Sequence, residues 1–221
     1  MIKLEFQTKI LLLSFAVTVV LGMIIVPILR RLKVGQIERS DGPETHLKKQ
    51  GTPTMGGIII MLGIIIVTIA AYAYYRTKDE ELAKNLFPIL GLTIGFGIIG
   101  FIDDFKKLIL KNTKGLKPSL KMLGLLLISV VFVLYIQKGL NLGTETYIPI
   151  LKEYITIPIY AYIPFAILVL LGATNAINLT DGIDGLSPSI CTIIITCLTV
   201  IATMLGVKEI VVFGAIVIGA V

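Results

Sequence analysis

The feature that most constrains this 221-residue chain is a series of uncharged runs, each long enough to cross a membrane as a helix. Only Lys121 interrupts these runs, which cover residues 10–29, 50–75, 85–102, 118–137, 154–180 and 185–207. A hydrocarbon core of ~30 Å needs about 20 helical residues. The chain is 56% hydrophobic and 15% charged, far from the balance of a soluble domain. The sequence therefore predicts an all-α, polytopic transmembrane helix bundle with six full spans.

A seventh apolar run begins at residue 210 and reaches only residue 221. At ~1.5 Å per residue it is roughly 18 Å long as a helix, which is too short to cross. This pattern indicates a single integral membrane domain over residues 1–221 that stops inside its seventh span, with no soluble domain. Between the fourth and fifth runs, the Thr, Tyr and Ile residues of 144–159 predict a short external β-hairpin.

The basic residues are concentrated in two of the loops between these runs. Charges balance in the loops after the second and fourth runs, whereas the loops after the first and third are strongly basic: Arg30, Arg31, Lys33, Arg39, Lys48 and Lys49, then Lys106, Lys107, Lys111, Lys114 and Lys117. Such an excess marks the cytoplasmic side of a membrane. The odd-numbered loops are therefore expected inside and the N-terminus outside. The net charge of +6 then needs no nucleic-acid partner.

The third loop opens with two adjacent carboxylates, Asp103 and Asp104. Ionised groups at the edge of a hydrocarbon layer are costly to desolvate and indicate function by default. On a helix the two side chains point about 100° apart, so one can face a cavity while the other binds backbone or a lysine. Such a pair can hold a divalent cation or supply a base. The alternative is an interfacial pair balanced by Lys106 and Lys107.

The fifth loop, residues 178–185, is dense in amides, carboxylates and glycines. Asp181 and Asp184 are each followed by glycine, which permits tight turns and lets a ligand approach main-chain N–H groups. Asn175 and Asn178 lie one helical turn apart, where their amides can reach a sugar or a nucleobase. The alternative is an Asx-rich turn between two helices.

The first loop ends in Lys-Gln-Gly-Thr-Pro-Thr-Met-Gly-Gly, residues 49–57. Lys49 and Thr54 can contact an anionic ligand, or the threonines can cap the following helix. Together the three odd-numbered loops supply the carboxylates, lysines and glycine turns that phosphoryl transfer needs. A rival from another class is a transporter that couples ions through its carboxylates. Transporters tend to place such groups near the bilayer midplane. Here the carboxylates lie at the ends of the uncharged runs on one side of the membrane, which favours the enzyme interpretation.

Three segments resemble the phospho-N-acetylmuramoyl-pentapeptide-transferase family, within the polyprenyl-phosphate N-acetylhexosamine-1-phosphate transferases. They are residues 49–57, Phe-Ile-Asp-Asp-Phe at 101–105, and Asn-Leu-Thr-Asp-Gly-Ile-Asp-Gly-Leu at 178–186. The superfamily shares the Asp-Asp motif, whereas the 49–57 segment is specific to the muramoyl branch. The nearest alternative is a sister N-acetylglucosamine-1-phosphate transferase that acts on polyprenyl phosphate.

The resemblance implies a bacterial inner-membrane enzyme of about ten spans that forms a homodimer, requires Mg²⁺ and has a cytoplasmic active site. The implied reaction moves phospho-N-acetylmuramoyl-pentapeptide from its UDP carrier to undecaprenyl phosphate. Its products are UMP and lipid I, the first lipid-linked intermediate of peptidoglycan synthesis.

Roles for individual residues follow from the same resemblance. Asp103 is the base or the phosphate-orienting carboxylate and can also ligate the metal, and Asp104 assists it. Lys107 and Lys121 meet phosphate. The nucleotide-sugar pocket is lined by the remaining carboxylates, lysine, hydroxyl and amides: Asp181, Asp184, Lys49, Thr54, Asn175 and Asn178. Asp181 and Asp184 are counted with Asp103 and Asp104 as catalytic residues.

Two further family motifs have no counterpart up to Val221. They are a Gly-Asp-x-Gly-Ser segment, whose aspartate is the main Mg²⁺ ligand, and a later His-rich loop. On this resemblance the chain is expected to be incomplete at its C-terminal end and inactive by itself. A radiolabel transfer assay on the isolated chain tests that expectation.

Overall fold

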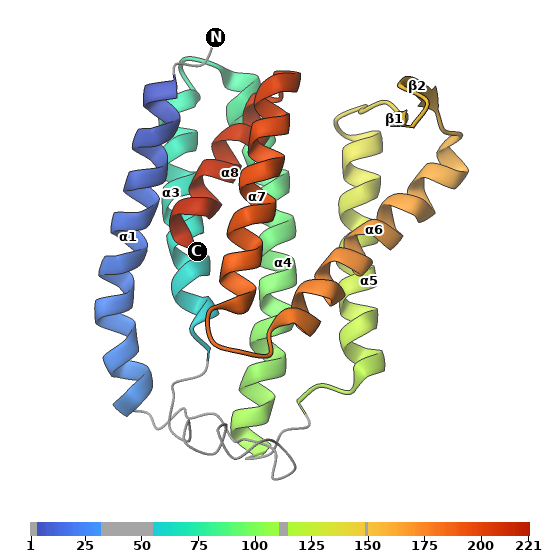
Figure 1. The fold of residues 1–221 in the computed structure, drawn as a ribbon. Coiled ribbons are helices and arrows are strands. Elements are labelled where there is room, and N and C mark those ends of the chain that lie inside the picture. Colours follow the sequence, from blue (N-terminus) through green and yellow to red (C-terminus); the bar gives the residue numbers. More distant parts are fainter. Residues whose placement is uncertain (1–3, 32–54, 111–114, 149) are drawn as a thin grey trace. The chain divides into compact units, whose positions relative to one another are not determined.

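The computed structural model describes residues 4–31, 55–110, 115–148 and 150–221. Helices dominate this part of the chain (Figure 1): α1 Leu4–Arg31, α3 Gly57–Tyr75, α4 Glu80–Leu110, α5 Pro118–Lys138, α6 Ile159–Thr180, α7 Leu186–Leu205 and α8 Lys208–Ala220. Strands β1 Glu145–Ile148 and β2 Glu153–Thr156 lie between α5 and α6.

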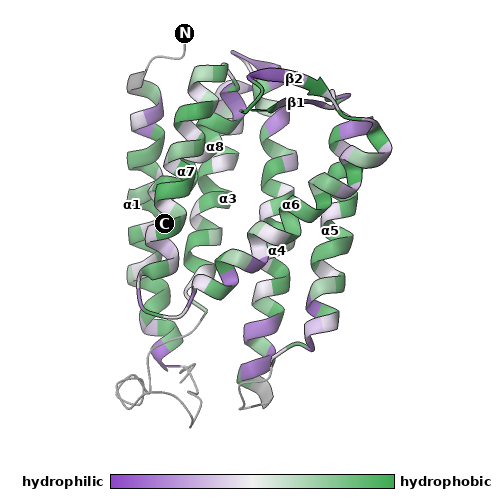
Figure 2. Cartoon of the chain, turned by 45° about the vertical axis from the view of Figure 1, so that its right-hand side comes forward, coloured by the Kyte–Doolittle hydropathy of each residue, from purple (hydrophilic) through white to green (hydrophobic). Residues whose placement is uncertain are grey.

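Six of the described helices, α1 and α3 to α7, are long and apolar enough to cross a membrane. Apolar residues run along most of each helix, and hydrophilic residues gather at helix ends and in the hairpin (Figure 2). Many large apolar side chains are exposed, such as Val131, Leu168 and Ile193, which are 64–68% exposed. Soluble proteins do not expose contiguous apolar surface on this scale. The predicted six spans are therefore confirmed, and the chain is a multi-span membrane protein.

The helix boundaries follow local sequence signals. Pro118 opens α5, where its missing N–H costs nothing and its fixed φ suits a first helical turn. Asp79 caps α4, because its Oδ1 accepts a hydrogen bond of 3.2 Å from the Leu82 N–H. Glu80 and Glu81 follow in the first turn, where negative charge complements the helix dipole. This cap explains why α4 begins before the uncharged run at 85–102.

The described residues form two compact units: Met1–Lys117 with Pro188–Val221, and Pro118–Ser187. In the first unit, α8 packs against α1, α3 and α4. Most of α8 is buried, and Ile216 and Val212 have no exposed surface. Ser14 of α1 donates a 2.6 Å hydrogen bond to the Ile216 carbonyl oxygen. The single-domain expectation for residues 1–221 stays a prediction.

Close approach of α8 to α1 depends on a small residue. A Cβ at Gly219 would meet the Leu11 carbonyl oxygen and would lie 2.9 Å from the Ser14 Cβ. Small residues allow transmembrane helix backbones to approach one another, which increases dispersion contacts between them.

In the second unit, α5 packs against α6. The antiparallel hairpin that joins them pairs Glu145 with Thr156 and Tyr147 with Tyr154, whose rings lie 5.2 Å apart. The predicted hairpin at 144–159 is thus confirmed. The run at 154–180 is helical only from Ile159, because its first residues pair in β2 and Pro158 precedes the helix.

Asp79 also anchors the start of α8, since the Lys208 Nζ lies 2.7 Å from its Oδ2. The Lys208 ammonium, followed by the Leu82 N–H, lowers the pKa of the Asp79 carboxyl. A carboxyl whose pKa is lower in the folded than in the unfolded state stabilises the fold at pH values above its pKa in the unfolded state. This stabilisation is lost as the pH falls through the pKa of the folded state. Asp79→Asn keeps a capping side chain but removes the charge.

We therefore expect Asp79→Asn to remove part of the acid-induced fall in thermal midpoint below about pH 4. The measurement is thermal unfolding in detergent across the acidic range. Equal acid sensitivity of the variant and the parent chain would contradict this assignment.

Candidate active site

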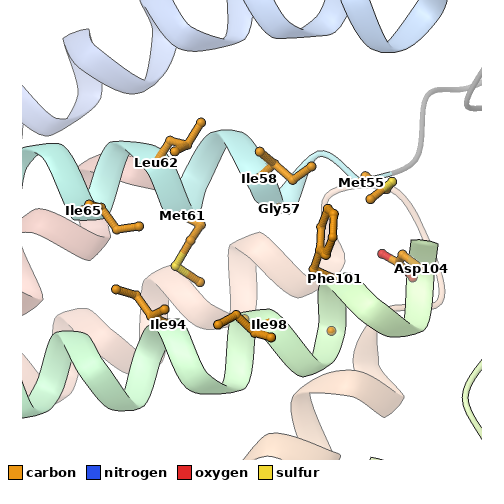
Figure 3. A pocket seen from close by; sticks show the side chains of 12 residues that line it. Met55, Gly57, Ile58, Met61, Leu62, Ile65, Ile94, Ile98, Phe101 and Asp104 are labelled. Carbon is orange, nitrogen blue, oxygen red and sulfur yellow. The ribbon is translucent and has the colours of Figure 1, made fainter. Parts of the chain in front are cut away.

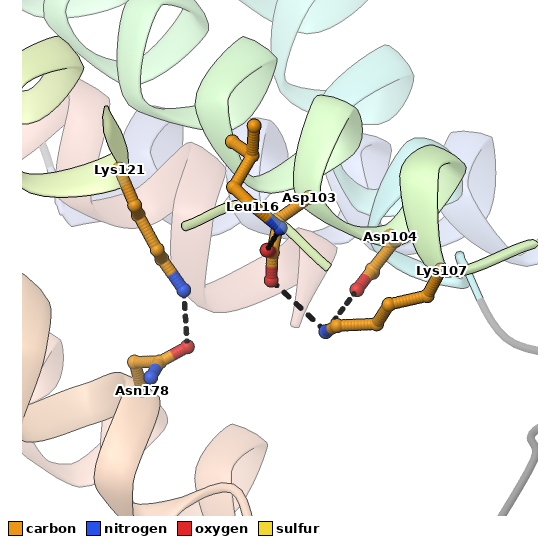
Figure 4. Close-up of polar contacts among 6 residues, drawn as sticks. All are labelled: Asp103, Asp104, Lys107, Leu116, Lys121 and Asn178. Carbon is orange, nitrogen blue, oxygen red and sulfur yellow. Dashed lines mark hydrogen bonds and ion pairs between the residues drawn. The ribbon is translucent and has the colours of Figure 1, made fainter. Parts of the chain in front are cut away.

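The C-terminal part of α4 carries a cluster of two carboxylates and one ammonium. Lys107 can reach both carboxylates, because it lies four residues after Asp103 and three after Asp104, and residues at these spacings are neighbours on a helix. The Lys107 Nζ lies 2.9 Å from the Asp103 Oδ2 and 3.0 Å from the Asp104 Oδ1 (Figure 4). The side chain of Asp103 is 11% exposed, against 41% for Asp104 and 40% for Lys107. A single ammonium thus contacts one buried and one half-exposed carboxylate, which leaves a net negative charge among the three groups.

A second contact to Asp103 comes from beyond α4. The Leu116 backbone N–H donates a 2.7 Å hydrogen bond to the Asp103 Oδ1. Both oxygens of this carboxylate therefore accept charge-assisted hydrogen bonds, which are stronger than neutral ones. Residues 115 and 116 therefore lie against α4 at Asp103, just before α5 begins at Pro118.

Asp104 points differently from its neighbour, as the 100° step along a helix predicts. It lines one end of a groove of about 490 Å³ between α3 and α4 (Figure 3). The rest of the lining is almost entirely apolar, including Ile58, Met61, Ile94 and Phe101. The arrangement expected for the pair is confirmed, with Asp103 bound to backbone and lysine and Asp104 at a cavity.

In the second unit, Lys121 of α5 contacts Asn178 of α6. The Lys121 Nζ donates a 3.0 Å hydrogen bond to the Asn178 Oδ1 (Figure 4). Asn175, one turn earlier, instead donates from its Nδ2 to the Leu171 carbonyl oxygen at 2.7 Å. The structure therefore joins two of the predicted substrate-binding residues, while the Asn175 amide nitrogen bonds to its own helix.

The segment after α6 forms an exposed turn. Asp181 ends the helix, and the Gly182 N–H donates to the Thr180 carbonyl oxygen at 2.9 Å. Asp184 is exposed as well, and Gly185 adopts a φ of +80°, which glycine tolerates best. Both carboxylates are accessible to a ligand, but the geometry is equally that of the Asx-rich turn considered from the sequence. Their catalytic assignment stays a prediction.

Lys49 and Thr54 lie outside the described residues, so their substrate-binding roles also stay predictions.

The side chains of this site that could bind a metal are the carboxylates of Asp103 and Asp104. Among the described residues, no three His, Cys, Asp or Glu side chains gather into a metal-binding group. Mg²⁺ usually binds through one or two carboxylates and completes its shell with water and substrate phosphates. The Asp103–Asp104 pair offers carboxylates of this kind, so the residues present fit a metal that arrives with a phosphorylated substrate.

Two elements of this site were not anticipated from the sequence: the Leu116 amide and the groove beside Asp104. Gly115, just ahead of a helix that starts with proline, signals a turn. The Leu116 N–H donates to Asp103 because of tertiary packing, and no sequence pattern predicts that partner.

Comparison with known proteins bears on what this cluster does. The sequence model of glycosyl transferase family 4 matches residues 86–221, more than half of the chain. The chain belongs to this family. Residues 49–61 also match signature 1 of phospho-N-acetylmuramoyl-pentapeptide-transferase, which confirms the resemblance expected from the sequence. The glycosyl transferase family 4 match includes all of α4 from Leu86, and therefore the Asp103–Asp104 cluster.

Similar proteins carry the name phospho-N-acetylmuramoyl-pentapeptide-transferase. That of Halalkalibacterium halodurans is 41% identical over 96% of this chain and 63% of its own length. The proteins of Acetivibrio thermocellus and Caldicellulosiruptor bescii are 41% and 37% identical, over 86% and 95% of this chain. The chain spans 55% and 62% of those two relatives.

Proposed function

We propose that this chain serves the transfer of phospho-N-acetylmuramoyl-pentapeptide from its UDP carrier to undecaprenyl phosphate. The names of its relatives and the signature at residues 49–61 support this substrate pair. The observation that carries the proposal is the Asp103–Asp104–Lys107 cluster, which lies at the end of a membrane-spanning helix and beside an apolar groove.

The reaction exchanges one phosphoanhydride bond for another. An oxygen of the lipid phosphate attacks the sugar-linked phosphorus, and a new P–O bond forms there. The bond between that phosphorus and the oxygen bridging it to the uridine-linked phosphate breaks, and UMP leaves with the electron pair. Such transfers require in-line positioning and neutralisation of phosphate charge more than covalent chemistry by the protein.

The α4 cluster suits both requirements. Asp103 is held in one orientation by the Lys107 ammonium and the Leu116 N–H. It can orient the attacking lipid phosphate or accept a proton from it. Lys107, 40% exposed, can exchange part of its contact with Asp104 for a phosphate oxygen. Such an arrangement supplies charge stabilisation where negative charge develops.

The second unit and the first loop would bind the nucleotide-sugar. The Asn178 amide and the Lys121 ammonium form a ready-made polar pair for a phosphate or a base edge. Asp181 and Asp184 lie on the exposed turn after α6. Lys49, Thr54 and Asn175 complete the proposed set.

We include Mg²⁺ as the cofactor of this reaction. When bound, Mg²⁺ neutralises phosphate oxygens during transfer. Asp103 and Asp104 are the described residues that would hold it, together with the substrate phosphates.

The groove between α3 and α4 suits the apolar chain of the lipid acceptor, because Asp104 marks its polar end. Leu62→Trp would fill the groove, and we expect it to raise the KM for undecaprenyl phosphate roughly tenfold. The KM for the nucleotide-sugar should stay unchanged. The measurement is initial-rate kinetics with each substrate varied in turn.

Ile69→Trp is the matched control for this prediction. Ile69 lies on the same helix, is 52% exposed and does not line the groove. An equal rise in KM for both variants, or none for Leu62→Trp, would remove the groove from the acceptor site.

Orientation and assembly are part of the same proposal. The basic first and third loops favour a cytoplasmic active site in the bacterial inner membrane, with the N-terminus outside. A homodimer is the expected assembly from the family resemblance.

The proposal is tested by a transfer assay on the full-length gene product. Radiolabelled UDP-N-acetylmuramoyl-pentapeptide, undecaprenyl phosphate and Mg²⁺ should give lipid I and UMP in equal amounts. Absence of labelled lipid would refute the proposal. Lipid product from UDP-N-acetylglucosamine instead would assign the chain to the sister transferases.

A further inference from the structure

The orientation of Asp103 depends on a residue outside its own helix. Lys107 contacts both carboxylates and is 40% exposed, so by itself it leaves the Asp103 side chain loosely specified. The Leu116 N–H contacts Asp103 at 2.7 Å, and a backbone donor cannot change rotamer. The direction of that N–H is set by the peptide that joins Gly115 to Leu116.

Gly115 has two properties that make a side chain costly there. Its φ is +51°, in the left-handed region that residues with a Cβ rarely adopt. It is also buried, and a Cβ built on it would lie 2.5 Å from the Asp103 Oδ1 and 2.9 Å from the Lys107 Cε. Real Cβ atoms essentially never approach other atoms so closely. The carboxylate therefore occupies the space that only glycine leaves open.

We propose that Gly115 is the positioning residue for Asp103. It brings the Leu116 N–H onto the Asp103 Oδ1 and leaves room for the carboxylate to sit against the backbone. This inference rests on the proposed function, in which Asp103 orients or deprotonates the lipid phosphate. It adds a residue that touches no substrate and acts only through another side chain.

The consequence of an added methyl group at residue 115 follows from these contacts. The Cβ must displace the Asp103 carboxylate, the Leu116 N–H or both, so the 2.7 Å hydrogen bond is lost or lengthened. A displacement of about 1 Å at a reacting group can cost about 100-fold in rate. Binding of the nucleotide-sugar, assigned to other residues, should be unaffected.

The experiment compares Gly115→Ala with Gly206→Ala in the full-length gene product. Gly206 has a φ of +75° but nothing within 4 Å of its Cβ position, so its substitution reproduces the backbone strain without the contact. We expect Gly115→Ala to lower kcat about 100-fold with the KM for the nucleotide-sugar unchanged. Gly206→Ala should keep kcat within a few-fold of the parent, after correction for folded protein.

Three outcomes separate the possibilities. No transfer by the parent enzyme refutes the proposed function itself. An active parent with equal kcat for the two alanine variants overturns the positioning role, because strain alone then explains both. A loss at Gly115 that affects kcat and KM together, in step with a lower thermal midpoint, also overturns it, since that pattern indicates a structural role.

A second measurement covers the case in which Gly115→Ala folds poorly. Replacing Leu116 by its α-hydroxy acid exchanges only the N–H for an oxygen and leaves Gly115 intact. The same selective loss of kcat supports the proposal, and an unchanged kcat refutes it.

Discussion

Asp103→Asn is expected to abolish transfer while leaving membrane insertion intact. The substitution keeps the shape of the side chain but removes the negative charge that pairs with Lys107 at 2.9 Å. An amide can neither accept a proton from the lipid phosphate nor ligate a metal as a carboxylate does. Removal of a single essential group in a unit of this kind typically costs at least 10³-fold in kcat. Lipid I formation and detergent-solubilised yield measure the two parts of the prediction.

Asp79→Asn provides a closely matched control for this variant. Asp79 also accepts hydrogen bonds from a backbone N–H and a lysine, those of Leu82 and Lys208, but it lies at the opposite end of α4. Its substitution should leave kcat unchanged. Turnover retained by Asp103→Asn would remove that carboxylate from the mechanism.

Lys107→Met should have the second-largest effect. It leaves two adjacent carboxylates without the ammonium that contacts both, and it removes a candidate donor to phosphate. Loss of one such donor typically costs about 10²–10³-fold in kcat. We also expect a lower thermal midpoint, because the buried Asp103 carboxylate loses a charged partner. Steady-state kinetics and thermal unfolding in detergent provide the measurements.

Lys84→Met is the corresponding control. Lys84 lies on the same helix and forms an i,i+4 ion pair with Glu80 at 2.8 Å, but both side chains are 69% exposed. Exposed pairs contribute little to stability. Comparable losses of activity in the two variants would show that charge on α4, rather than the contact with Asp103 and Asp104, governs the rate.

The six membrane spans could be predicted because they depend on one property, the length of uncharged sequence. The structure keeps all six, and it changes their ends where local chemistry intervenes. Asp79 extends α4 towards its N-terminus by capping it. β2 takes the first residues of the run at 154–180, because Thr, Tyr and Ile favour pairing with β1.

The candidate site was only partly predictable. The ion pairs of Asp103 and Asp104 with Lys107 follow from helical spacing, as does the different direction of the two carboxylates. The Leu116 contact does not, because it requires a positive φ at Gly115 and tertiary packing that places Leu116 against Asp103. The pairing of Lys121 with Asn178 joins residues 57 apart and likewise depends on how α5 packs against α6.

The central claim is that the Asp103 region and the turn after α6 serve a reaction at the cytoplasmic membrane surface. Single cysteines at Phe105 and Leu179, which are 47% and 83% exposed, test it in a background with Cys191 and Cys197 replaced by serine. We expect a membrane-impermeant maleimide to label both from the cytoplasmic side, and the nucleotide-sugar with Mg²⁺ to slow labelling. Labelling of the two cysteines from opposite sides of the membrane would contradict the account.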